Sequence, residues 1–128
     1  MTDPNLQRWI DDPDFLYLSQ DMDLILMSAF TPLQLCQLMR SPKLNDEKKS
    51  WVISALVEVV EHHVVQPDGE TDQSLLEMIR ETLNVCRALC LKTLPDLGVG
   101  NDEILASMIG SDQPNELEAI VRKRSFPT

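Results

Sequence analysis

Apolar side chains recur every three or four residues along most of the chain, which is the spacing of one face of an α-helix. Residues 72–94 are apolar around so much of a helical surface that we expect this helix at the centre of the fold. Residues 46–66 also show helical spacing, although their valines favour strands. About twenty residues without Gly or Pro are too long for an ordinary strand, so we predict a helix there too.

Short polar sequences predict where helices begin. Asp12 precedes Pro13 and Thr31 precedes Pro32, an arrangement typical of helix N-termini. Asn45 can cap the helix over residues 46–66, and Thr71 or Asp72 can cap the helix that follows. Within residues 46–66, Lys48 and the other charged residues lie largely off the apolar face. Further helices are expected at residues 13–30, bent or broken around 19–21, and at 32–40, 101–110 and about 112–124.

The fold class follows from these elements. We predict an all-α protein, an irregular bundle of five to six helices in a single domain over residues 1–128. Turns are expected at 67–69 and 96–100, where Gly, Pro and Asp gather. Residues 1–11 and 125–128 are expected to be flexible ends or to contact a partner.

The charge of the chain narrows the classes of partner. Eleven Lys and Arg stand against 21 Asp and Glu, giving a formal net charge of -10. Such a field repels phosphate backbones, so we expect no direct binding of nucleic acid. Negative charge is densest near the N-terminus, and positive charge gathers at Arg122, Lys123 and Arg124, which form a candidate second contact site.

Three cysteines, an odd number in apolar helical surroundings, fit a reducing compartment better than secretion. The N-terminus has neither the positive start nor the apolar run of a signal peptide. No stretch reaches the 18 or so apolar residues that a membrane helix needs. We therefore expect a cytoplasmic protein that has no membrane contact.

Two pairs of residues carry the only candidate chemistry. His62 and His63 could supply zinc ligands together with Cys86 and Cys90 on the neighbouring predicted helix. One histidine could also act as a general base, with Glu58 or Glu61 one turn away to orient its imidazole. However, the two cysteines lie on an apolar stripe at a spacing unusual for structural zinc, and core packing explains them better. We expect no metal, no cofactor and no enzymatic activity. A small metal-dependent enzyme that uses these four residues is the alternative.

The N-terminal third favours binding to another protein, because aromatic and acidic residues alternate there. The alternative is that its aromatics only cover the core. The consecutive apolar residues 15–18 cannot all be buried by one helix face. The predicted contact residues are Trp9, Asp11, Asp12, Asp14, Phe15, Tyr17 and Asp21.

The leading hypothesis is therefore a regulator, adaptor or assembly factor that binds a protein, one whose surface could be basic. A rival is a charge-complementary inhibitor, such as an immunity protein, of a basic nuclease or nucleic-acid-binding partner. Homodimerisation stays open, because apolar residues are abundant for a small bundle.

Overall fold

Eight α-helices make up most of the part that this computed structural model describes, which is residues 4–66, 69–98, 100–110 and 114–125. They are α1 (Pro4–Asp11), α2 (Met22–Ala29), α3 (Pro32–Arg40), α4 (Asp46–Val59), α5 (Gln73–Val85), α6 (Arg87–Thr93), α7 (Asn101–Gly110) and α8 (Pro114–Ser125). A π-helical turn, η1 (Val60–Val64), and a 3₁₀ turn, η2 (Leu94–Asp96), complete the set. The all-α prediction is confirmed, and the expected five to six helices are eight in the described part. The nearest feature to a sheet there is one isolated bridge, between Val65 and Thr71.

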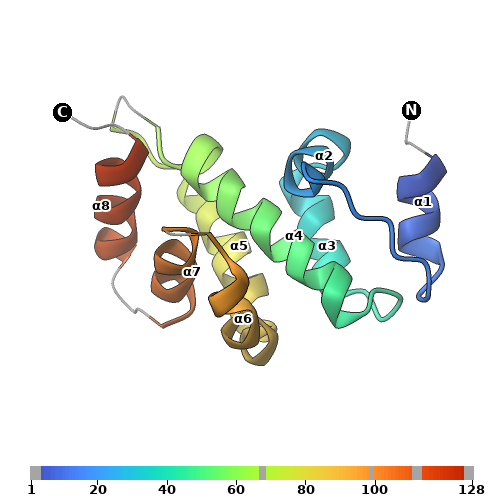
Figure 1. Cartoon of the computed structure of the whole chain (residues 1–128). Helices are drawn as coiled ribbons and strands as arrows, with labels where there is room; N and C mark the ends of the chain where they lie inside the picture. Colours follow the sequence, from blue (N-terminus) through green and yellow to red (C-terminus); the bar gives the residue numbers. More distant parts are fainter. Residues whose placement is uncertain (1–3, 67–68, 99, 111–113, 126–128) are drawn as a thin grey trace.

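Helix α4 occupies the middle of the bundle, with α2 and α3 on one side and α5 to α8 on the other (Figure 1). Val52, Ile53 and Leu56 on α4 are fully buried. The prediction that residues 72–94 form one central helix is wrong. That stretch is divided into α5 and α6 at Cys86, whose backbone leaves helical geometry (φ -100°, ψ 27°).

The break follows two side chains that bond to the backbone of their own helix. Thr82 Oγ1 donates to the Met78 carbonyl at 2.9 Å, and Asn84 Nδ2 donates to the Arg80 carbonyl at 2.9 Å. Such bonds compete with the helical pattern and bend helices. In α5 they lie two and four residues before Cys86, where the apolar stripe continues but the helix does not.

The helix caps form largely as the sequence predicts. Thr31 Oγ1 accepts from the Gln34 amide, and the Gln34 side chain accepts from the Thr31 amide, a complete capping box. Asn45 Oδ1 accepts from the Lys48 amide at 2.9 Å, and Asp72 Oδ1 accepts from the Leu75 amide at 3.1 Å. The predicted helix over residues 46–66 is present, but its last turn widens into η1.

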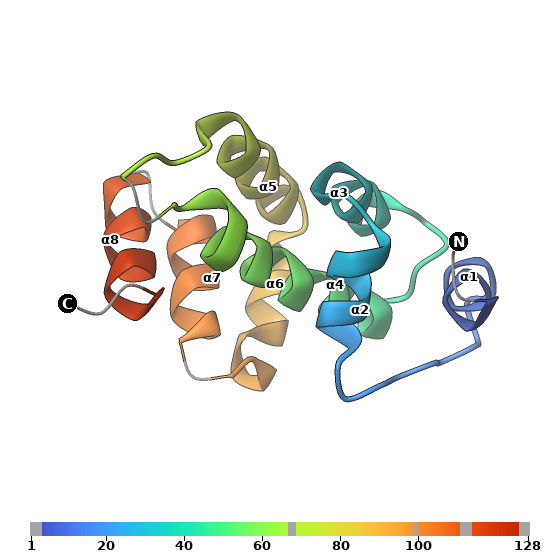
Figure 2. The ribbon, with the colours of Figure 1, turned by 90° about the horizontal axis from the view of Figure 1, so that it is seen from above.

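The N-terminal region differs most from expectation. Residues 4–11 form α1, with Leu6 and Trp9 buried, where a flexible or partner-contacting end was expected. The helix expected over residues 13–30 begins only at Met22. Between them the chain runs as a long connection along one side of the bundle (Figure 2). The predicted break around residues 19–21 is thus a much longer non-helical stretch.

The C-terminal helices lie where the sequence places them, since α7 and α8 match the expected 101–110 and 112–124 closely. Several sequence predictions concern residues outside the described part: positions 67–68 and 99 of the turns, position 112, and the ends at 1–3 and 126–128. Among the described residues, no helix alone has the length and apolar character to cross a membrane. The adjacent α2 and α3 meet that test only as a pair, bent by 112°.

Candidate functional site

A buried lysine fastens the N-terminal region to the centre of the fold. Lys48 lies in the first turn of α4 and is 0% exposed. Its Nζ donates to the carbonyls of Trp9, at 2.5 Å, and Asp12, at 2.6 Å, where α1 ends. A cation is stabilising at this end of a helix. Asn45 Nδ2 also donates to the Pro13 carbonyl at 3.0 Å. We call these three hydrogen bonds the Lys48 clasp.

The clasp was missed in the sequence, where Lys48 was expected to lie largely off the apolar face. Burial lowers the pKa of the Lys48 ammonium, and the carboxylates of Asp12 and Asp14 partly oppose that effect. Because Nζ also lies 5.5 Å from the centre of the Trp9 ring, the positive charge is enclosed by carbonyl oxygens and an aromatic face. The chain direction at residues 9–13 is thereby fixed.

Residues 15–19, which follow, lie outside any helix or turn, and we call them the 15–19 segment. Exposure alternates along it: Phe15 and Tyr17 are half-buried and pack on the core, whereas Leu16 is 44% and Leu18 is 42% exposed. Alternation with a period of two is the pattern of extended backbone. The Arg8 guanidinium lies 4.2 Å from the centre of the Phe15 ring and holds that ring in place.

The structure brings most of the predicted contact residues to this region. The aspartates Asp11, Asp14 and Asp21 are exposed, and Asp12 is half-buried. Trp9 is 0% exposed and covers the core, which was the alternative explanation for the N-terminal aromatics. Tyr17 and Phe15 show only part of their surface.

The exposed residues that the site prediction omitted are Leu16 and Leu18. The signal for them was the run of four consecutive apolar residues at 15–18, which cannot share one helix face.

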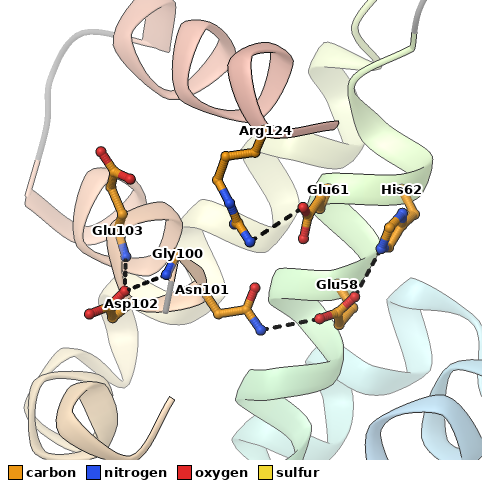
Figure 3. Close-up of polar contacts among 8 residues, drawn as sticks. All are labelled: Glu58, Glu61, His62, Gly100, Asn101, Asp102, Glu103 and Arg124. Carbon is orange, nitrogen blue, oxygen red and sulfur yellow. Dashed lines mark hydrogen bonds and ion pairs between the residues drawn. The ribbon is translucent and has the colours of Figure 1, made fainter. Parts of the chain in front are cut away.

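A separate cluster of polar side chains connects α4, η1, α7 and α8 (Figure 3). Glu58 accepts from His62 Nε2 at 3.0 Å and from Asn101 Nδ2 at 3.1 Å, one bond on each carboxylate oxygen. Arg124 Nη2 lies 3.6 Å from Glu61 Oε1. The hydrogen bond between His62 and Glu58 matches the expected pairing of a histidine with a glutamate one turn away.

This polar group holds the only set of three close metal-ligand side chains in the described part of the chain. One ligand atom each from Glu58, Glu61 and His62 lies within 4.8 Å of the others. Arg124 already provides a positive charge there, and both oxygens of Glu58 are engaged. The contacts therefore describe a polar junction between helices, which explains the cluster without an ion.

The ligand set suggested by the sequence is not assembled. Cys86 Sγ lies 3.7 Å from the Met39 carbonyl, and Cys90 Sγ lies 3.5 Å from the Leu83 carbonyl. Neither thiol joins His62 or His63 in a close group of ligands. Burial raises the pKa of the Cys90 thiol to about 12, which keeps it protonated and a poor ligand or nucleophile.

The side chains of His62 and His63 lie in different surroundings. His62 takes part in the polar junction and its side chain is 56% exposed. His63 lines an open hollow of about 400 Å³ together with Met27, Phe30, Thr31, Pro32 and Val59. Consecutive helical residues point in different directions, so the pair does not form one site.

Searches for related proteins found no family model, no curated protein and no solved structure that matches this chain.

Proposed function

We propose that this protein acts by binding another protein, and that the contact is centred on the 15–19 segment. The observation that carries the proposal is a pair of outward leucines on a fixed, extended backbone. Leu16 and Leu18 are two positions apart, so their side chains leave the same face about 7 Å from one another. Single exposed leucines are common on protein surfaces, but an adjacent pair on one face forms a small apolar surface for a partner.

The clasp supports this proposal because it fixes the segment in advance. Lys48 and Asn45 hold the chain at residues 9–13, and α2 continues it from Met22. A segment already held in place loses little conformational freedom when a partner binds, and this favours affinity.

Charge defines the rim of the surface. Between Arg8 and Arg40 the chain contains five aspartates, at positions 11, 12, 14, 21 and 23, and no Lys, Arg or His. All five lie within four residues of the 15–19 segment. A partner with basic residues around an apolar centre would complement this rim, and the charges would accelerate its approach.

The test uses serine substitutions with a matched control. Leu16→Ser with Leu18→Ser removes the apolar centre, whereas Leu91→Ser changes a similarly exposed leucine (47%) on α6. In affinity capture from the native host, we expect the wild type and Leu91→Ser to retain the same protein and the double variant to lose it. Thermal unfolding should remain close to wild type in all three. Equal capture by all three proteins contradicts a contact at this segment.

Salt separates this proposal from the charge-complementary inhibitor. An apolar contact with a charged rim weakens only moderately when ionic strength rises from about 0.05 to about 0.5 M, because screening acts on the rim alone. Binding that is abolished by salt and unaffected by the double serine substitution would instead favour the inhibitor.

A further inference from the structure

We infer that the 15–19 segment binds its partner by strand addition, and that the partner contributes an extended stretch with Lys or Arg on both sides of alternating apolar residues. The inference rests on the proposed function and specifies the mode of binding and the chemistry of the partner. The observation behind it is the backbone of Leu16, Tyr17 and Leu18 together with the alternation of their side chains.

The backbone of these three residues is unpaired within the described part of the chain. Hydrogen bonds close on either side, from the Phe15 amide to the Asp12 carbonyl at 3.1 Å and from the Met22 amide to the Ser19 carbonyl at 3.2 Å. Between them, the amides and carbonyls of Leu16, Tyr17 and Leu18 form no hydrogen bond with any other described residue. A row of unpaired groups on extended backbone is a template for another strand.

The packing of the 15–19 segment on the core leaves the backbone amides and carbonyls of residues 16–18 free to pair with another chain. Phe15 and Tyr17 pack on the core, so the side chains of one face hold the segment to the bundle. In an extended chain the amides and carbonyls point sideways, perpendicular to the side chains. Figure 2 shows the connection between α1 and α2 running along the outside of the bundle, without a neighbouring extended segment alongside it in the described part.

Charge argues that the added strand comes from a different protein. Two copies paired antiparallel about Tyr17 would bring Asp14 of one copy close to Asp21 of the other at each end of the paired stretch. Like charges facing one another across a strand pair are destabilising. Basic residues at those positions of a partner would instead face the aspartates at both ends, and apolar residues between them would cover Leu16 and Leu18.

A synthetic peptide tests the inference directly. The probe is a blocked heptapeptide of sequence Lys-Thr-Val-Thr-Val-Thr-Lys, added to the full chain while backbone amide signals are followed by NMR. We expect shifts centred on the amides of Leu16, Tyr17 and Leu18, and slower hydrogen exchange there. Replacing both lysines of the peptide with glutamate should abolish the shifts, because the aspartates then face like charges.

Backbone methylation of the peptide distinguishes strand pairing from other contacts. Only alternate amides of a strand point toward its neighbour, so the peptide is methylated on one alternate set of nitrogens or on the other. Methylation of the paired set should weaken binding about tenfold or more, whereas methylation of the opposite set should have little effect.

Equal affinity for the two methylated peptides, or no shifts at residues 16–18 with the unmodified peptide, would overturn strand addition. The proposed function fails separately, through the capture experiment with the serine variants, because that experiment does not depend on how the backbone pairs.

Discussion

The substitution Lys48→Met removes the hydrogen bonds of the clasp that come from the ammonium while keeping a side chain of similar length in the same space. Two hydrogen bonds from a charged group contribute about 1.5–3 kcal/mol each. Their loss is partly offset, because a buried ammonium carries a desolvation cost of several kcal/mol that the thioether does not. We expect the free energy of unfolding to fall by about 2 kcal/mol.

The effect should be concentrated in the N-terminal region. Without Lys48, the carbonyls of Trp9 and Asp12 lose their hydrogen-bond donor. Local opening of the N-terminal region lets water donate to these carbonyls instead, at a lower cost in free energy than leaving them buried and unpaired. Relative to the wild type, we expect the substitution to accelerate hydrogen exchange more for the amides of residues 4–21 than for those of α4. Urea unfolding of the same samples measures the overall loss of stability. Lys49→Met is the matched control, because the Lys49 side chain has no hydrogen bond or ion pair to another described residue. A Lys48→Met protein as stable and as protected as this control would refute the clasp.

The same substitution has a pH dependence of defined sign. Burial lowers the pKa of the folded-state ammonium below its ordinary 10.5, so between the two values the unfolded state binds more protons than the folded state. The stability of the wild type relative to Lys48→Met should therefore rise with pH in that window and level off above about 10.5. The neutral amine keeps two N–H groups for the two carbonyls. Denaturant unfolding of both proteins from about pH 8 upward measures this difference in stability. A stability difference that falls as pH rises would contradict this reasoning.

Two further predictions concern the rest of the bundle. Gly100→Ala should destabilise the protein more than Gly69→Ala, by about 1 kcal/mol. Both glycines have positive φ, but a Cβ at position 100 would lie 2.3 Å from Arg124 Cζ and nothing lies within 4 Å at position 69. Equal losses in thermal unfolding would show that Arg124 moves away freely. In thiol titration of the native protein, Cys86 should react before Cys90, whose pKa is raised to about 12 and which is fully buried. The reverse order would refute this assignment.

Helical periodicity and capping chemistry were enough to predict much of the fold. Thr31, Asn45 and Asp72 cap helices through local hydrogen bonds, which depend on neighbouring residues alone. The helix over residues 46–59 formed despite its valines, because burial between other helices outweighs a weak preference for strands.

The failures have a common physical cause, which is that contacts distant in sequence decided the outcome. Residues 15–18 were predicted to belong to a helix. In the structure they lie outside any helix, and Phe15 and Tyr17 pack against the core. Lys48 looked like an ordinary surface residue, because its partners lie 36 and 39 positions earlier in the chain. The acidic rim could be predicted from the positions of the aspartates, and the run at 15–18 indicated that some of its apolar side chains stay uncovered. Only the structure identifies them as Leu16 and Leu18.

The length of chain between the clasp and its lysine also matters during synthesis. Trp9 is synthesised 39 residues before Lys48, an interval of about 2–8 seconds at ordinary elongation rates. Until α4 has followed them out of the ribosome, the apolar residues at 15–18 lack the core against which Phe15 and Tyr17 pack. The aspartates on both sides then act as gatekeepers, because their repulsion keeps nascent chains from aggregating through this stretch.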